Sequence, residues 1–135
     1  MESEQNMQFI PASHSDLSEA PLVASLSTVG ADGTPQVTAI WYVIESGTVR
    51  ISLVRTRQKY KNLIAHRQAT LFIIDPENPF RTLEIRGTVK VDEDSGLELF
   101  DRVFRHYGAD PATAAAAREG RVAVTLVPTR VVAQG

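Results

Sequence analysis

A cluster of basic residues is the first candidate for chemistry, because four lysines and arginines fall within seven positions. The cluster reads Arg55-Thr56-Arg57-Gln58-Lys59-Tyr60-Lys61 and lies where an alternating apolar run ends and a helical pattern begins. A helix N-terminus carries unpaired backbone N–H groups and a partial positive charge, and arginines add bidentate hydrogen bonds. This junction predicts a binding site for a phosphate or phosphodiester. A solvated basic helix face is an equally good interpretation of the cluster alone.

Two further groups of residues are suited to contact a flat heterocycle. Gln36, Thr38 and Trp41 lie in an otherwise apolar predicted strand, and a loop places Phe80 beside Arg81. Rings of this kind take hydrogen bonds at their edges and apolar or cationic contacts on their faces. Taken alone, each group has a more ordinary interpretation: Trp41 as core or dimer interface, and the loop as an exposed turn.

Other kinds of chemistry lack their signatures. The 135 residues include no cysteine, which removes disulfides, thiolate nucleophiles and cysteine-type metal sites. The three histidines are far apart, so no metal site is predicted, and no dinucleotide, P-loop or nucleophile-elbow motif occurs. The net charge of −2 gives no basic field for nucleic acid, and no apolar run approaches the ~20 residues that span a bilayer. The N-terminus is acidic, unlike a signal peptide. We therefore expect a soluble, cytoplasmic protein without nucleic-acid or membrane partners.

The elements that would position these residues follow from apolar periodicity. Strands are expected over 22–29, 36–44, 49–53, 69–74, 82–91 and 121–127, with a further short strand over 129–133. Helices are expected over 13–19 (N-cap Ser13 or Ser15), 57–66 (N-cap Thr56), 94–107 (C-cap Gly108) and 110–118 (N-cap Asp110). Turns are expected at 30–33 and 45–47, and a loop at 77–80. Residues 1–12 are expected to form a flexible arm and residues 13–135 a single domain.

The strand pattern predicts a closed or nearly closed antiparallel barrel. Short strands joined by hairpins, with a helix inserted after the third, are typical of that architecture. The fifth strand alternates most clearly, with Leu83, Ile85, Gly87, Val89 and Val91 on one face. Alternation of this kind argues against a doubly wound parallel sheet, whose strands are buried on both faces.

Three segments carry a family resemblance that covers residues 17–133. They read PLVASLSTVGADGTPQVTAIWYV, RISLVRTRQKYKNLIAHRQATLFIID and LEIRGTVKV, and the most specific piece is R-x-K-x-x-N-L, formed by Arg57, Lys59, Asn62 and Leu63. On these residues the chain resembles the pyridoxamine 5′-phosphate oxidase-like split β-barrel proteins, and most of all the branch of F420-dependent enzymes. The resemblance implies a mainly β fold with α-helices: a split barrel of six to seven antiparallel strands with flanking helices.

The same resemblance implies a homodimer with two cofactor sites at the subunit interface. It implies that the phosphate is held by Arg57 and Lys59, with Arg55, Thr56 and Asn62 near it. It also implies that the ring is flanked by Gln36, Thr38, Ala39, Ile40 and Trp41, and that Phe80 and Arg81 come from the other subunit. In such proteins the ring transfers hydride while the protein supplies binding and orientation, so no catalytic side chain is expected.

The activity expected from this resemblance is hydride transfer between coenzyme F420 and a small organic substrate. F420 is preferred to FMN because its phosphodiester and oligoglutamate tail suit the basic segment. The chain also lacks the basic C-terminal residues that a pyridoxamine phosphate oxidase needs. An FMN-dependent oxidoreductase and a non-catalytic cofactor carrier are the alternatives.

Overall fold

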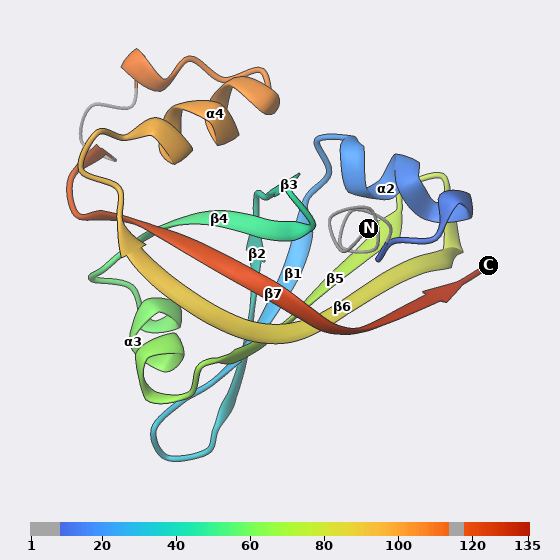
Figure 1. The fold of residues 1–135 in the computed structure, drawn as a ribbon, viewed down its shortest axis with the longest axis horizontal. Helices are drawn as coiled ribbons and strands as arrows, with labels where there is room; N and C mark the ends of the chain where they lie inside the picture. The colour runs from blue at the N-terminus through green and yellow to red at the C-terminus, as the bar shows by residue number, and fades with distance from the viewer. Residues whose placement is uncertain (1–8, 114–117) are drawn as a thin grey trace.

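The computed structural model describes residues 9–113 and 118–135, in which seven strands form one sheet (Figure 1). The strands are β1 (Ala24–Val29), β2 (Pro35–Ile40), β3 (Val43–Glu45), β4 (Thr48–Val54), β5 (Gln68–Asp75), β6 (Asn78–Glu93) and β7 (Arg121–Gln134). The helical segments are η1 (Ala12–His14), α2 (Ser15–Glu19), α3 (Gln58–Ala65), α4 (Glu98–His106) and η2 (Pro111–Thr113). Within these described ranges, no helix has the length and apolar character that a membrane span requires.

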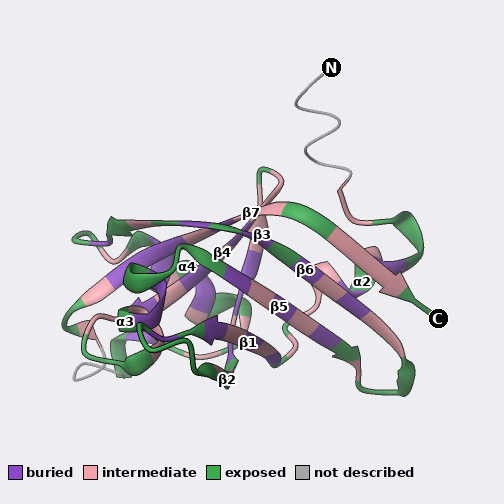
Figure 2. Ribbon diagram, turned by 90° about the horizontal axis from the view of Figure 1, so that it is seen from below, coloured by how far each residue is buried: buried purple, intermediate pink, exposed green. Residues whose placement is uncertain are grey.

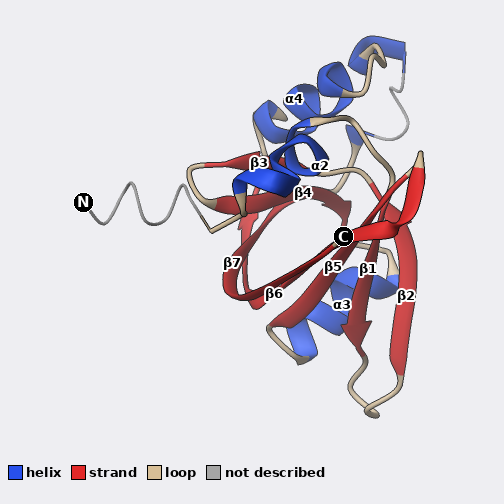
Figure 3. Ribbon diagram, turned by 90° about the vertical axis from the view of Figure 1, so that its right-hand side faces the viewer, coloured by secondary structure: helices blue, strands red, loops and turns tan. Residues whose placement is uncertain are grey.

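The sheet closes on itself because its two end strands are consecutive in the chain. The strand order is β2-β1-β5-β6-β7-β4-β3, and every pairing is antiparallel. Only Trp41 and Tyr42 separate β2 from β3, so the two ends of the sheet are joined there and the sheet curls into a barrel. Figure 3 shows this barrel with α3 on one side and α2 and α4 on the other. The predicted split barrel with flanking helices is confirmed.

The region predicted as one strand over 36–44 is two strands with a break, which corrects the sequence interpretation. At the break, the backbone N–H of Tyr42 donates to the hydroxyl of Tyr107 (3.0 Å), directly after α4, and not to a neighbouring strand. The Tyr42 ring enters the core, where its hydroxyl donates to the Leu17 carbonyl (2.6 Å) and burial raises its pKa well above the usual value. A contact distant in sequence therefore causes the break, and the local strand-forming residues do not show it.

The C-terminal segment is one long strand, where the sequence predicts a strand over 121–127 and a separate one over 129–133. The register of β6 against β7 shifts by one residue beside Gly87, which faces Pro128, so Thr129 is the extra residue of a bulge. A bulge accommodates a proline, which has no N–H to donate to the ladder. The strand therefore continues past the residue that was expected to end it.

The structure also differs from the sequence prediction in where several helices and strands begin. The loop expected over 77–80 is shorter, because β6 already includes its last residues. The predicted N-caps Ser13, Ser15 and Thr56 make no capping hydrogen bond; α3 begins instead after Arg57, whose backbone is extended.

The N-terminus of α4 is capped by a buried carboxylate. Asp94 accepts hydrogen bonds from the backbone N–H groups of Leu99 (3.2 Å) and Phe100 (3.0 Å), so the helix starts later than expected. A negative charge at this end of the helix is favourable, because it meets the partial positive charge of the N-terminus. At the other end Gly108 has a positive φ of 74°, as the predicted C-cap requires.

Two predictions fall partly outside the described residues. The helix expected over 110–118 begins as η2, capped by the Asp110 side chain, and residues 114–117 are not described. Of the arm expected over 1–12, only the last four residues are described, and among these Phe9 and Ile10 pack against the core.

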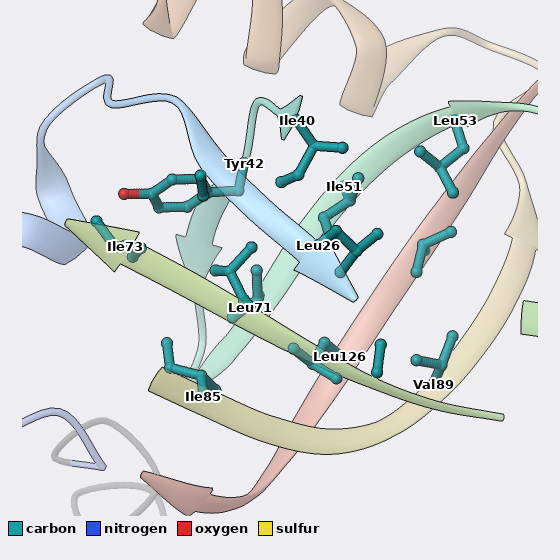
Figure 4. Close-up of a cluster of buried hydrophobic side chains, with 14 of the residues drawn as sticks. Leu26, Ile40, Tyr42, Ile51, Leu53, Leu71, Ile73, Ile85, Val89 and Leu126 are labelled. Atoms are coloured by element: carbon teal, nitrogen blue, oxygen red, sulfur yellow. The ribbon is translucent and has the colours of Figure 1, made fainter. Parts of the chain in front are cut away.

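Alternation along the strands fills the barrel with apolar side chains, which Figure 2 shows as buried and exposed bands. In β6 the inward face of Leu83, Ile85, Gly87 and Val89 is buried, as predicted. Figure 4 shows side chains from β1, β4, β5, β6 and β7 converging in this interior. Full burial of one such side chain contributes about 1.5–3 kcal/mol, so the barrel forms a stable frame for the residues on its outer side.

Replacing Gly87 by alanine should destabilise this frame. The added Cβ would lie 2.1 Å from the Val127 carbonyl oxygen of β7, so one strand must move. We expect a loss of about 1–3 kcal/mol in the free energy of unfolding, the usual cost of overpacking. Gly96→Ala is the control, because the nearest atom there is 3.7 Å away in the Glu98 side chain. Equal losses in urea denaturation of the two variants would contradict the prediction.

Candidate cofactor site

One cavity of about 480 Å³ brings together five of the predicted site residues. Most of its lining residues come from β4, the start of α3, α4, the start of β7, and the end of β2 with the residue that follows it. Its predicted lining residues are Ala39, Ile40, Trp41, Arg57 and Lys59, and the others are Val23, Ser52, Leu53, Val54, Val103, Phe104 and Arg121. A larger cavity of about 800 Å³, between α2, the β3–β4 turn and α4, contains none of the predicted site residues.

The basic segment reaches this cavity because of the way the chain leaves β4. The backbone N–H of Arg57 donates to the Val54 carbonyl (3.0 Å), which closes a turn before α3. The N–H of Arg55 donates to the Gly120 carbonyl (2.9 Å), which ties this turn to the start of β7. Arg57, at the N-cap of α3, and Lys59, in its first turn, are thereby held near the strands and line the cavity.

Lys59 is half-buried in the cavity wall, where its ammonium donates to the Thr38 hydroxyl on β2 (3.3 Å). Burial is the main cause that lowers the pKa of Lys59, and the positive charges of Arg57 and Arg121 lower it further. Among the described residues, no salt bridge includes Arg57 or Lys59. Cations gathered in this way favour an anionic ligand.

Arg121 is a third cation of this cavity, and sequence analysis did not identify it. It begins β7, and its guanidinium donates to the Ser52 carbonyl on β4 (3.3 Å) and lies over the Phe100 ring of α4, 4.6 Å from the centroid. Burial lowers the pKa of Arg121, the charge of Arg57 adds to this, and Asp94 opposes it. No local signal marks this residue, because only the pairing of β4 with β7 brings it here.

Another part of the cavity wall is aromatic. The Trp41 ring stacks on Tyr107 (centroids 4.6 Å apart, planes 7° apart) and meets Phe104 edge-on (5.3 Å, 68°). The Tyr107 hydroxyl donates to the Leu22 carbonyl (2.7 Å), which fixes the stack. Trp41 therefore presents a rigid aromatic surface beside the cations, a combination that suits a flat heterocycle with a phosphate.

Gln36 and Asn62 were predicted near the cofactor, but neither lines the cavity. Asn62 is buried, and its amide donates to the Thr28 hydroxyl (3.0 Å) and to the side-chain oxygen of Gln36 (3.2 Å). Its own oxygen accepts from Gln58 (2.7 Å). This network joins α3 to β1 and β2 and thereby holds the helix that carries Lys59.

Arg55 and Thr56, also predicted near the phosphate, lie in the turn before the cavity and do not line it. Arg55 forms an ion pair with Glu93 at the end of β6 and borders a separate cavity of about 200 Å³. Thr56 is exposed in the turn.

Phe80 and Arg81, which the resemblance assigns to the other subunit, lie near the turn between β5 and β6, at the opposite end of the barrel from α3 (Figure 1). Phe80 is 83% exposed. The Arg81 guanidinium donates to the carboxylates of Asp16 and Asp75 and to the Ser13 carbonyl. Arg81 therefore fastens α2 to this turn, and Phe80 is the member of the pair that faces solvent.

Comparison with known proteins agrees with this fold. A family model described as pyridoxamine 5′-phosphate oxidase matches residues 10–135. The chain belongs to the pyridoxamine 5′-phosphate oxidase family. This family includes oxidoreductases, and its fold binds FMN-type cofactors. No curated protein matches the sequence.

Solved structures of the same fold differ in what they are described to do. One described as an F420 reductase is 33% identical to this chain, with a TM-score of 0.83 and coverage of 91% of this chain and 98% of the other. The conserved hypothetical protein Rv2991 from Mycobacterium tuberculosis is 22% identical (TM-score 0.77, coverage 93% and 84%). The haem storage protein HutZ from Vibrio cholerae is 17% identical (TM-score 0.74, coverage 93% and 94%). The last two are similar in fold alone.

Replacing Arg57 by glutamine should raise the pKa of Lys59, because it removes one of the two positive charges that lower this pKa. The titration of the Lys59 side chain, followed by NMR, measures the change. Lys61→Gln is the control, because Lys61 is exposed on the same helix and does not contribute to the shift. An unchanged Lys59 pKa in Arg57→Gln would contradict the charge arrangement described here.

The lowered pKa of Lys59 also has a consequence for stability. Between the folded-state pKa and the ordinary value of lysine, the unfolded chain binds more protons than the folded protein. The charged ammonium therefore destabilises the fold at neutral pH, and this penalty shrinks as the pH rises through that range.

Proposed function

We propose that this protein transfers hydride between coenzyme F420 and a small organic substrate. The observation that carries the proposal is the cavity in which Arg57 and Lys59, at the start of α3, lie beside the aromatic surface of Trp41. A cofactor with a flat ring and a phosphodiester requires both features in one place. Membership of an oxidoreductase-containing family and the 33% identity to an F420 reductase support this choice.

The residues of the cavity divide the binding between phosphate and ring. Arg57 and Lys59 hold the phosphate together with the backbone N–H groups at the start of α3, and Ala39, Ile40 and Trp41 flank the ring. When bound, the deazaflavin supplies the hydride chemistry, and the protein supplies orientation and electrostatics. The lining within the described residues contains no aspartate, glutamate or histidine, so we assign no catalytic acid or base to it.

FMN is the alternative cofactor, since it also combines a flat ring with a phosphate. We favour F420 because its acidic tail adds negative charge, which the basic segment around Arg57 attracts. A protein that only carries the cofactor would use the same cavity but would not oxidise the reduced cofactor with any substrate.

We also propose that two copies of the chain form a homodimer through the outer face of β1, β2 and β5. Val29, Val37 and Ile74 expose 36%, 65% and 46% of their surface. The strand registers place all three on this one side of the sheet. Apolar side chains gathered on one exposed face are typical of an interaction surface. In such a dimer, Phe80 provides an aromatic contact to the partner's ring.

Removing either phosphate-binding cation should weaken cofactor binding by about 1–3 kcal/mol, the range for a lost charged hydrogen bond. Binding can be followed through Trp41, which is the only tryptophan of the chain and lines the cavity. Fluorescence titrations of the wild type, Arg57→Ala and Lys59→Ala with F420 and with FMN give the affinities. Lys90→Ala is the control, because Lys90 is exposed on β6 and outside the cavity.

The same titrations separate the alternatives. Tighter binding of FMN than of F420 would reverse the choice of cofactor, and full affinity in both cation variants would remove the phosphate assignment. Oxidation of reduced F420 in the presence of a substrate panel distinguishes an enzyme from a carrier.

Replacing Val37 by aspartate should convert the dimer into monomers, because a buried carboxylate without a partner opposes association. Sedimentation equilibrium of the wild type and of Val37→Asp measures their oligomeric states. Ile64→Asp is the control, because Ile64 is a 42% exposed apolar residue on α3, away from the proposed face. A wild type that sediments as a monomer would refute the dimer.

A further inference from the structure

We propose that Arg121 is a third anion-binding residue of the cavity, so that the site recognises a ligand with two negative charges close together. This inference rests on the proposed function and adds to it a residue from the last strand and a charge requirement. A phosphomonoester dianion has the required charge, as does a phosphodiester followed by a carboxylate.

The pairing of β4 with β7 sets the position of Arg121, and the basic segment does not. Arg121 begins β7, whereas Arg57 precedes α3 and Lys59 lies in its first turn, yet all three line one cavity. The Ser52 carbonyl accepts from its guanidinium at 3.3 Å, and the fully buried Phe100 ring lies beneath it at 4.6 Å. A guanidinium already fixed in this way loses little conformational freedom when a ligand binds.

The three cations are close enough to act on one another. The charges of Arg57 and Arg121 both lower the pKa of Lys59, and the charge of Arg57 lowers the pKa of Arg121. Asp94 is one negative group that acts on Arg121, and its carboxylate also caps α4. The described lining of the cavity includes these three cations and no aspartate or glutamate, so a ligand with two negative charges interacts with it more favourably than a ligand with one.

A purely structural role explains less of this arrangement. If Arg121 served only to cover Phe100, a second guanidinium already does so, because Arg118 lies 5.3 Å from the same ring centroid. Packing between β4 and α4 also gives no reason to place a third cation beside Arg57 and Lys59, where it raises their electrostatic energy.

Two ligand pairs isolate the contribution of the anion. FMN is compared with riboflavin, and F420 is compared with its deazaflavin fragment that lacks the phosphodiester and tail. Arg121→Met keeps an apolar side chain over Phe100 but removes the charge. In this variant the affinity of the charged ligand relative to that of the uncharged one should fall about tenfold or more in each pair. The affinity for riboflavin and the deazaflavin fragment should change less than about twofold. Arg67→Met is the control, because Arg67 is exposed after α3 and outside the cavity.

The outcomes separate this inference from the proposed function. If Arg121→Met lowers the affinity equally for charged and uncharged ligands, or changes neither affinity, Arg121 is structural and the inference fails. In that case the proposed function still stands if Arg57→Ala lowers the ratio of the charged to the uncharged ligand's affinity. If the wild type itself binds the charged members no better than the uncharged ones, the proposed function fails.

The two pairs also identify the source of the charge. A larger effect for FMN assigns Arg121 to a phosphomonoester dianion, and a larger effect for F420 assigns it to the tail carboxylates; either supports the inference. If Arg121→Met does not fold, Arg121→Lys and Arg121→Gln replace it. Arg121→Lys should then keep most of the preference for the charged ligand, and Arg121→Gln should lose it. Loss of this preference in both variants, or in neither of them, would overturn the inference.

Discussion

Repulsion among Arg57, Lys59 and Arg121 is the constraint around which the surrounding residues are arranged. Each of these cations approaches others of the same sign, and Lys59 and Arg121 also lose hydration on entering the cavity wall. Hydrogen bonds to Thr38 and Ser52 hold two of them in place. These hydrogen bonds do not remove the repulsion between the cations. The free energy that keeps the protein folded in spite of it therefore comes from another part of the molecule. The apolar interior of the barrel, on the other side of the same strands, provides it.

Polar groups outside the cavity hold in place the two helices that contribute to its wall. The buried amide of Asn62 is satisfied by β1, β2 and its own helix, so α3 cannot shift without leaving buried polar atoms unpaired. Asp94 has the same effect on α4, whose Phe104, together with Tyr107 directly after the helix, holds Trp41. Two of these anchoring residues, Asn62 and Gln36, belong to the set that the resemblance placed near the cofactor. In this structure they lie outside the cavity and position the helix that carries Lys59, and their contact with a cofactor stays a prediction.

The parts of the fold that depend on local patterns could be predicted from the sequence, and the parts that depend on long-range contacts could not. The alternation of β6 and the change from strand to helix after β4 are local, and both are found where the sequence predicts them, although Thr56 does not cap the helix. The break after Ile40 depends on Tyr107, and the continuation of β7 past Pro128 depends on the bulge beside Gly87. Arg121 was missed for the same reason, because its neighbours in the cavity lie far away in sequence.

The turn between β5 and β6 is fixed before any second copy of the chain arrives. Arg81 donates to two carboxylates and a carbonyl of its own chain, so the neighbouring Phe80 is presented to solvent from a rigid base. The exposed Asp16 contributes little to stability through its ion pair, but a fixed turn lowers the entropy that association would otherwise cost. In the proposed dimer, each chain has ordered the groups that it contributes to the interface before the two chains meet. The cations and Trp41 are preorganised by one chain, and the exposed aromatic ring is preorganised by the other. Assembly then needs to bury apolar surface without also having to order the groups that meet the cofactor.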